Sequence, residues 1–306
     1  MAEVSVIIPV FNVETYIKRA IHSVLSQIDV DVQLIVVDDA STDETWSVIQ
    51  SIMDVRMTTF QNEVNKGPAY CRNKGIELAQ GEWLAILDGD DFWSNERLRK
   101  MVDFCKEEHL DGCFDDIWIQ AQRPNAIRYS ELVPKNRRLF ALSTISLLDV
   151  VNTYVAFFKP IISMTFLNES KVRYRENMRY SEDFCFVYDM VAAGARLAVL
   201  NMALYFYTSS RPGSLSSDAD KLFQGIVDSA ALYITTEKNT VIIHGLEQRI
   251  SEAYGLWDYH RTIIDIQGRH YLRAVYRTLR RPQVLFHGIM SVLNRIYRKL
   301  KDFHII

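Results

Sequence analysis

The sequence predicts an α/β fold, in which a mostly parallel central sheet is flanked by helices and a helical extension follows at the carboxyl end. Apolar, β-rich runs alternate with amphipathic segments that have helical spacing. This alternation favours parallel strands joined by right-handed crossovers. Polar side chains follow three of the runs, and the chain from about Asp218 onward is helical in character. We therefore expect a layered domain at residues 1–217 and a helical region at 218–306.

Four apolar runs and the segments between them define the first half of the sheet. After the second run, Ser41 and Glu44 form a capping-box pattern that predicts the start of a helix. In order, the expected elements are a strand at 4–10, a helix at 15–27, a strand at 33–37, the helix after Ser41, a strand at 58–61, a helix between Gly67 and Gly81, and a strand at 84–87.

Beyond Gly112 the pattern is less regular. In order, we expect a strand at 114–120, a polar excursion at 123–138, a helix at 140–151, a helix between Ser181 and Gly194, a strand at 196–207 and a loop at 209–214.

The segment 82–91 is the most informative, because an apolar run typical of a buried strand is followed by three carboxylates. Asp88, Asp90 and Asp91 at one strand end repel one another, and a bound divalent cation with a preference for oxygen ligands would offset that repulsion. Gly89 suits the tight turn that this segment needs. The alternative is a solvated surface turn, which the same residue types also form.

Two other strand ends carry similar side chains, namely Asn12 after the first strand and Asp38 with Asp39 after the second. In parallel α/β sheets, ligands bind at the carboxyl ends of the strands. Three strand ends that all finish in ligand-type side chains are much less expected by chance than one. The sequence therefore predicts a binding site at this edge of the sheet.

Bulk properties are those of a globular protein. Of the 306 residues, 48% are hydrophobic and 24% are charged, which excludes disordered and fibrous classes. The amino terminus lacks the pattern of a secretion signal. The four cysteines lie far apart without C-x-x-C spacing, which argues for reduced thiols and against a zinc site. We expect a cytoplasmic protein.

The net charge of −3 conceals an uneven distribution. Residues 269–306 contain nine Lys or Arg and one Asp, so this tail carries +8 and the rest of the chain −11. We expect residues 269–301 to form a cationic amphipathic helix, either lying on an anionic membrane surface or packed on protein, within the chain or in a homodimer. Nucleic acid is not an expected partner, because no stacking platform or binding motif accompanies the arginines.

Six motifs in order resemble those of family 2 glycosyltransferases, which are inverting enzymes with the GT-A fold that build bacterial polysaccharides. The likeness covers residues 3–216 and is nearest to succinoglycan-type exopolysaccharide glucosyltransferases. It implies a nucleotide-binding half at 1–111 and an acceptor half at 112–217. The motifs are Val4 to Asn12, Val36 to Asp43, Asn65 to Gly67 with Ala69, Arg72, Asn73 and Gly75, Leu87 to Asp91, Glu182 with Asp183, and Arg211 to Ser216.

The resemblance implies a UDP-sugar donor at the strand ends. Asp39 would accept a hydrogen bond from the uracil imide, with helix capping as its alternative role. Asp90 would bind Mg²⁺ or Mn²⁺ at the diphosphate, and Asp88 would approach the ribose or the metal. For Lys66 a solvated position stays open, as does a plain surface turn at 211–214. The residues implied to bind the nucleotide sugar are Pro9, Val10, Phe11, Asp39, Lys66, Gly67, Arg72, Asp88, Gly89, Asp90, Arg211 and Ser214.

The resemblance further implies that Asp183 is the general base and that Glu182 orients the acceptor. When the bond from an anomeric carbon to a diphosphate breaks, a carboxylate on the opposite face must take the proton of the attacking hydroxyl. In-line displacement with one base inverts the anomeric centre. An acidic pair that favours a helix start is the alternative. Asp91, Asp115 and Asp116 are candidates for contact with the donor or acceptor sugar, with support of the neighbouring carboxylates or edge solvation as their alternatives.

We therefore expect an inverting, metal-dependent transferase at the inner face of the cell membrane. It would move a hexose, with glucose as the first choice, from a UDP-sugar to a polyprenyl-diphosphate-linked glycan in exopolysaccharide or surface-polysaccharide synthesis. A sugar nucleotidyltransferase is one rival, but it should show a Gly-rich phosphate loop where this chain has residues 11–14, Phe-Asn-Val-Glu. A non-catalytic scaffold that binds nucleotide sugars is the other rival, because a fold can persist without turnover.

Overall fold

The computed structural model describes residues 2–120, 127–128, 134–209 and 218–280. The chain forms two compact units, Met1–Ser214 and Leu215–Ile306. The strands of the first unit are β1 (Val4–Val10), β2 (Val32–Asp38), β3 (Met57–Gln61), β4 (Trp83–Ile86), β5 (Phe92–Trp93), β6 (Gly112–Gln120), β7 (Ile127–Arg128), β8 (Ile161–Ser163) and β9 (Leu197–Thr208). Its helices are α1 (Ile17–Leu25), α2 (Thr45–Gln50), α3 (Pro68–Leu78), α4 (Arg97–Glu107), α6 (Leu147–Asn152), α7 (Met164–Ser170) and α8 (Glu182–Ala192), with 3-10 turns η1 (Pro134–Ala141) and η2 (Val155–Phe157).

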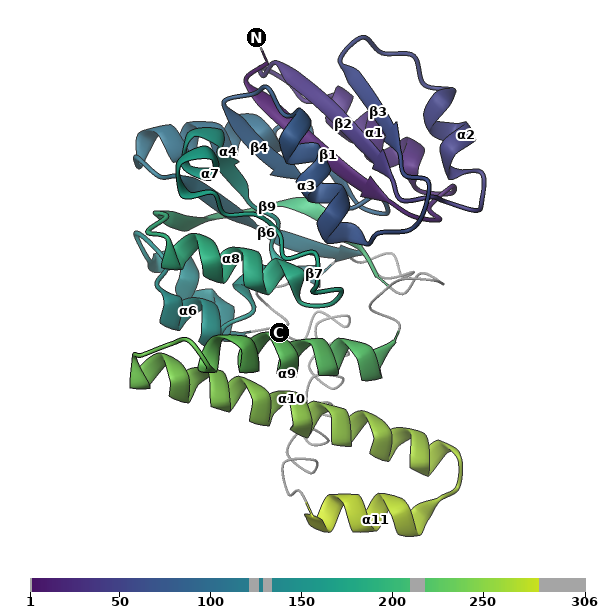
Figure 1. The fold of residues 1–306 in the computed structure, drawn as a ribbon, viewed down its shortest axis with the longest axis vertical. Coiled ribbons are helices and arrows are strands. Elements are labelled where there is room, and N and C mark those ends of the chain that lie inside the picture. The colour runs from purple at the N-terminus through teal and green to yellow at the C-terminus, as the bar shows by residue number, and fades with distance from the viewer. Residues whose placement is uncertain (1, 121–126, 129–133, 210–217, 281–306) are drawn as a thin grey trace, which may run out of the picture. The chain divides into compact units, whose positions relative to one another are not determined.

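The strands form one sheet in the order β3-β2-β1-β4-β8-β6-β9-β5 within the described residues, with β7 paired to β6 (Figure 1). Strand β1 pairs in parallel with β2 and β4, and β2 pairs in parallel with β3. Every residue of β1 is buried, as expected for a central parallel strand that is covered on both faces. The parallel half of the sheet thus confirms the expected α/β class.

Helix α3 packs closely on this half of the sheet, because it carries a glycine at the contact. A Cβ atom on Gly75 would lie 2.5 Å from the Ile7 side chain of β1. In Figure 1, α3 crosses in front of these first strands. The close approach brings Arg72, which lies about one turn before Gly75 on α3, to the edge where β1 and β4 end.

The second half of the sheet mixes directions in a way that the sequence did not indicate. Strand β8 runs antiparallel to both β4 and β6, whereas β6 and β9 are parallel, and β5 pairs antiparallel with β9. Ala85 of β4 is the partner of Ile161 of β8. Because β8 runs in the opposite direction, it begins where β4 ends, so that Lys159 lies beside Asp88.

Two expectations about helix starts are wrong. The segment expected as one helix at 140–151 is the 3-10 turn η1 followed by α6, which begins at Leu147 behind a capping box of Ser146 and Asp149. The capping box expected at Ser41 is also not formed, because α2 begins only at Thr45 and its N-cap residue Glu44 makes no side-chain cap hydrogen bond. The Ser41 hydroxyl instead donates to Asp38 and accepts from the Asn12 amide, which ties the ends of β1 and β2 together.

The described part of the second unit, residues 218–280, is helical, as predicted. It comprises α9 (Ala219–Ile234), α10 (Thr240–Gln267) and α11 (Tyr271–Arg280). Trp257 and Arg261 of α10 both bind the Asp220 carboxylate of α9, at 2.6 Å and 3.1 Å. Among the residues that the structure describes, no helix is both long and apolar enough to cross a bilayer.

Candidate functional site

The end of β2 is fixed to the loop before α3 by one buried carboxylate. The Asp39 amide donates to the Val10 carbonyl at 2.8 Å. The Asp39 carboxylate accepts hydrogen bonds from the Asn62 side chain and from the amides of Lys66 and Gly67, each at 2.8 Å. Gly67 has φ of 91°, a conformation that favours glycine. Asp39 therefore organises the start of α3, whatever else it binds.

The residues expected to surround the nucleotide differ in exposure. Pro9 and Val10 are buried, whereas Phe11 is 41% exposed beyond the end of β1. Lys66 is exposed, and its ammonium group lies 3.1 Å from the Tyr70 hydroxyl. A Cβ atom on Gly89 would lie 2.7 Å from Val10, so what Gly89 supplies is the space that lets the loop after β4 close on β1.

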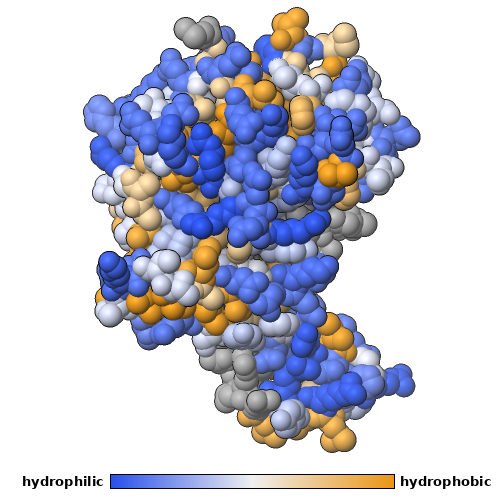
Figure 2. All heavy atoms as spheres, in the orientation of Figure 1, coloured by the Kyte–Doolittle hydropathy of each residue, from blue (hydrophilic) through white to orange (hydrophobic). Residues whose placement is uncertain are grey.

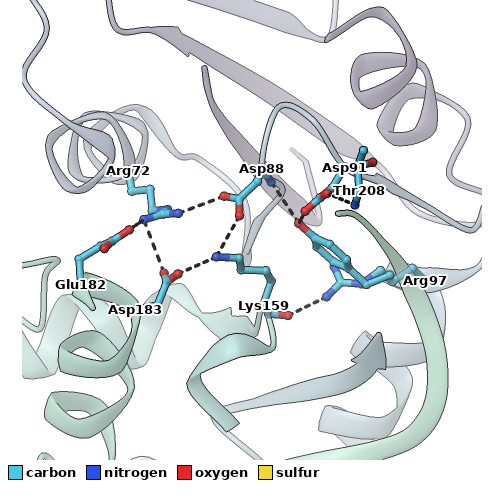
Figure 3. Close-up of polar contacts among 9 residues, drawn as sticks. Arg72, Asp88, Asp91, Arg97, Lys159, Glu182, Asp183 and Thr208 are labelled. Atoms are coloured by element: carbon cyan, nitrogen blue, oxygen red, sulfur yellow. Dashed lines mark hydrogen bonds and ion pairs between the residues drawn. The ribbon is translucent and has the colours of Figure 1, made fainter. Parts of the chain in front are cut away.

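Five charged side chains from four separate segments meet at the centre of this edge (Figure 3). Arg72 comes from α3, Asp88 from the loop after β4, Lys159 from the segment before β8, and Glu182 and Asp183 from the first turn of α8. Strand ends and helix starts gather at the same edge of the sheet, which is why groups so far apart in the sequence can converge.

Arg72 is the first of two buried cations in this cluster. It is only 3% exposed. Its guanidinium lies 2.7 Å from Glu182, 3.0 Å from Asp88 and 3.5 Å from Asp183. A buried arginine that contacts three carboxylates can hold their relative positions, because its planar fork has fixed geometry.

Lys159 is the second cation, and it was not singled out from the sequence. It is 8% exposed, and its ammonium lies 2.6 Å from Asp183 and 3.0 Å from Asp88. The available signal was a lysine inside the apolar stretch Val155 to Ile162, since lysines are almost never buried unless they are paired. Asp88 and Asp183 thus share the same two cations.

The charges in the cluster reinforce one another. Burial alone would raise the pKa of Asp88, but the charges of Lys159 and Arg72 outweigh it and hold that pKa well below its ordinary value. Burial would likewise lower the pKa of Lys159, and the carboxylates of Asp183 and Asp88 outweigh it, so this pKa is raised. Burial and the nearby Asp183 raise the pKa of Glu182. Asp88 is therefore ionised and Lys159 is charged.

A second buried ion pair supports Lys159 from behind. Arg97 and Asp115 are both fully buried and lie 2.7 Å apart, and Arg97 also donates to the Lys159 carbonyl at 2.7 Å. Asp115 accepts from the Leu204 amide as well. Asp116 is fully buried next to it. The structure thus places Asp115 and Asp116 in the interior, which argues against edge solvation. Their contact with a donor or acceptor sugar stays a prediction.

Asp91 also points inward. It is fully buried and accepts hydrogen bonds from the Tyr205 hydroxyl and the Thr208 amide, each at 2.7 Å. Burial and the neighbouring carboxylates of Asp90 and Asp88 raise its pKa well above the ordinary value. Asp91 therefore anchors the end of β9, which leads to the segment with Arg211 and Ser214. These last two residues lie outside the described part of the chain.

The repulsion among the three carboxylates after β4 led us to expect that they face a common centre. In the structure they do not. Asp88 is paired with the two cations, Asp91 is turned inward, and Asp90 stays partly exposed while its carbonyl accepts from Arg19 at 2.9 Å. In the described ranges, no three His, Cys, Asp or Glu side chains gather to hold a metal ion. Asp90 fits Mg²⁺ or Mn²⁺ that takes its other ligands mainly from a diphosphate, because Mg²⁺ commonly uses one or two carboxylates with substrate phosphates. Both oxygens of Asp88 contact Arg72 and Lys159 here.

This chain is similar to several known proteins. Residues 5–166 match the family described as Glycosyl transferase family 2. The succinoglycan biosynthesis protein ExoO of Rhizobium meliloti is 32% identical over 223 residues, which are 70% of this chain and 62% of that protein. The UDP-Glc:alpha-D-GlcNAc-diphosphoundecaprenol beta-1,3-glucosyltransferase WfaP of Escherichia coli is 33% identical over 120 residues, 39% of this chain and 48% of WfaP. The match thus spans less than two thirds of either relative.

Two solved structures share the fold. TarS 1–349 of S. aureus in complex with UDP-GlcNAc superposes with a TM-score of 0.63 at 23% identity, over 83% of this chain and 72% of that chain. The mannosyltransferase PcManGT of Pyrobaculum calidifontis, in complex with GDP-Man and Mn²⁺, gives a TM-score of 0.62 at 15% identity, over 95% of this chain and 84% of that chain. These likenesses confirm the predicted GT-A fold.

Proposed function

Because the chain belongs to glycosyl transferase family 2, we propose that it transfers a hexose from a UDP-sugar to a lipid-linked glycan in bacterial exopolysaccharide or surface-polysaccharide synthesis. The name of WfaP specifies a UDP-glucose donor and a diphosphoundecaprenol-linked acceptor. ExoO acts in succinoglycan biosynthesis, and TarS has been solved with UDP-GlcNAc. These relatives support glucose as the first donor sugar to test and a polyprenyl-diphosphate glycan as acceptor.

One observation carries the proposal. Asp88 lies in the loop after β4, at the strand ends expected to hold the donor, and Asp183 lies 95 positions later at the start of α8. Arg72 and Lys159 contact both carboxylates. Asp88 on the donor side and the candidate base Asp183 are thus bridged by the same cationic side chains. A displacement at the anomeric carbon requires donor and base to be held close together in this way.

The proposed reaction is a single displacement. The acceptor hydroxyl oxygen forms a bond to the anomeric carbon while the bond from that carbon to the diphosphate oxygen breaks, and UDP leaves with the bonding electron pair. Asp183 takes the hydroxyl proton as general base. Its side chain is 24% exposed, against 10% for Glu182, so it is the more accessible of the two carboxylates. Attack from the face opposite the diphosphate gives inversion.

The developing charge on the departing diphosphate needs an electrostatic partner. Asp90, with Asp88 as the second candidate ligand, would hold Mg²⁺ or Mn²⁺, which when bound would neutralise negative charge on the diphosphate. The presence of Mn²⁺ in the PcManGT structure supports this assignment. Phe11, Lys66 and Asp39 are proposed to contact the nucleotide.

A release assay tests the proposal. UDP-glucose, Mn²⁺ and a membrane extract from a polysaccharide-producing bacterium are supplied, and UDP is measured for the wild type and for Asp183→Asn. Loss of a general base lowers turnover by about 10²–10⁴-fold. Asp189→Asn is the matched control, because Asp189 lies on the same helix and pairs with Arg175. Unchanged turnover in Asp183→Asn would remove the base assignment, and nucleotide binding without turnover under all donors would favour the scaffold.

We also propose that the second unit meets an anionic membrane surface through α11. Its apolar side chains point away from the unit's interior, with Leu272 at 87%, Val275 at 55%, Tyr276 at 65% and Leu279 at 78% exposure. Figure 2 shows apolar atoms on this helix next to hydrophilic ones. Arg273 is exposed on the same helix. An exposed apolar stripe beside arginines suits the interface of an anionic bilayer, where a lipid-linked acceptor would lie. A homodimer contact is the competing explanation.

A further inference from the structure

Two cations and two carboxylates alternate in a closed ring within the site (Figure 3). Arg72 lies 3.0 Å from Asp88, Asp88 lies 3.0 Å from Lys159, Lys159 lies 2.6 Å from Asp183, and Asp183 lies 3.5 Å from Arg72. The cation side chains are 4% and 9% exposed, and those of the carboxylates are 26% and 24% exposed. The cations are thus more deeply buried than the carboxylates.

We propose that Lys159 is a positioning residue, which fixes the orientation of the Asp183 carboxylate and couples it to the donor-side carboxylate Asp88. This inference rests on the proposed function, because it assigns Lys159 a role through the candidate base. Lys159 contacts the carboxylate at 2.6 Å, whereas Arg72 lies 3.5 Å away and is closer to Glu182. Lys159 is therefore the nearer of the two constraints on Asp183.

The backbone of Lys159 is held firmly enough to act in this way. Its carbonyl accepts from the fully buried Arg97 at 2.7 Å. Pro160 follows directly, and a following proline restricts the backbone of the residue before it to extended conformations. Strand β8 begins at Ile161 and pairs with both β4 and β6. The Lys159 ammonium group is thus carried on a backbone whose position is fixed on both sides.

Orientation matters here because proton transfer requires the base at hydrogen-bond distance from the attacking hydroxyl. A misplacement of about 1 Å in an active site can lower the rate about 10²-fold. The competing explanation is that Lys159 turns to the donor diphosphate and contributes binding alone. The two explanations differ in which kinetic constant changes when the ammonium is removed.

A double-mutant cycle on the full chain separates them. Lys159→Met, Asp183→Asn and the double variant are compared with the wild type in the UDP-release assay, with UDP-glucose varied at a fixed amount of membrane extract. We expect Lys159→Met to lower kcat about 10²-fold with little change in the KM for UDP-glucose. The double variant should be no slower than Asp183→Asn, because groups that act as a unit are not additive. Lys159→Arg, which keeps the charge, should recover part of kcat.

The control is Lys106→Met, since Lys106 pairs with Glu3 on the surface of the same unit. Melting curves of all variants establish that they fold, and Lys159→Gln replaces the methionine variant in the cycle if that variant unfolds. Multiplying losses in the double variant would overturn the inference while leaving the base assignment intact. A raised KM with unchanged kcat would overturn it in favour of donor binding. Full activity of Asp183→Asn would instead remove the base itself.

Discussion

Arg97 donates a hydrogen bond to the carbonyl of Lys159 at 2.7 Å, although its side chain is completely buried. Its charge is balanced by Asp115, which is equally buried. Two ion pairs are therefore linked through Lys159, namely the partly exposed Lys159–Asp183 pair and the fully buried Arg97–Asp115 pair. Burial of charge is unfavourable unless the partners are well placed. The buried Arg97–Asp115 pair therefore holds Arg97 in place, and Arg97 in turn holds the backbone of Lys159.

The buried pair of Arg97 and Asp115 should be costly to break. Arg97→Met leaves Asp115 buried without its partner, which lowers the free energy of unfolding by about 3–5 kcal/mol. Arg99→Met, on the same helix, removes near-surface pairs with Glu3 and Asp103 and should cost about 0–1 kcal/mol. Urea unfolding of both variants gives the comparison. Equal losses would show that the interior pair has no special weight.

The two neighbouring acids at the start of α8 should differ in effect. Glu182→Gln keeps an oxygen for Arg72 and should reduce turnover far less than Asp183→Asn, because Glu182 is held at 2.7 Å by that arginine. UDP release measured side by side for both variants decides. Should Glu182→Gln prove the slower of the two, the base assignment would move to Glu182.

The metal proposal concerns Asp90. Wild-type protein should bind UDP more tightly when Mn²⁺ is present, and Asp90→Ala should lose about tenfold or more of metal-dependent affinity. Calorimetric titration with UDP, with and without Mn²⁺, measures this. Asp103→Ala, an acid on the surface of α4, serves as control. A cation effect of the same size in Asp90→Ala would exclude Asp90 as a metal ligand.

Close packing of α3 on β1 gives a prediction whose sign is not obvious. Alanine is the better helix former by about 1 kcal/mol, but a Cβ on Gly75 would lie 2.5 Å from Ile7. Overpacking of a core costs about 1–3 kcal/mol, so Gly75→Ala should be destabilising overall. Lys74→Ala, one residue earlier, should stay within about 0.5 kcal/mol. A higher melting temperature for Gly75→Ala would contradict the described packing.

The membrane proposal predicts a charge- and surface-specific effect. Leu272→Glu with Leu279→Glu should greatly reduce sedimentation of the full chain with vesicles of phosphatidylcholine and phosphatidylglycerol. Val241→Glu, at an exposed apolar position of α10, should leave it unchanged. Binding should weaken as salt rises, because exposed charges are screened. No binding to anionic vesicles, together with dimers that the leucine variants dissociate, would favour the homodimer instead.

The parallel half of the sheet could be predicted because β1, β2 and β4 are distinct apolar runs, and because β1, β2 and β3 each precede a helix. Strand β8 could not, since only two of its three residues are apolar and antiparallel pairing leaves no local mark. The helix expected at 140–151 was placed too early because Phe140 fits a helical spacing. The cap is supplied by Ser146, and α6 begins after it.

The candidate site was predictable to the same degree. Arg72, Asp88, Glu182 and Asp183 belong to motifs that can be recognised, and the structure brings them together. Lys159 is an isolated basic residue in the sequence, whereas Arg97 stands in a basic run with Arg99 and Lys100. The function of both depends on partners that only the fold supplies. For Asp115, the position on a strand near the motif suggested a substrate contact, and only the fold shows that this residue pairs with the buried Arg97.

The position of β9 at the end of the first unit affects how this protein folds while it is being translated. This strand, Leu197–Thr208, lies between β6 and β5 in the sheet. Until the ribosome has released that stretch, β6 has an open side and β5 has no partner. An open strand edge is a template for intermolecular pairing. Interrupted translation products that stop within α8 are therefore expected to aggregate, and nascent chains should need chaperone protection until Thr208 emerges.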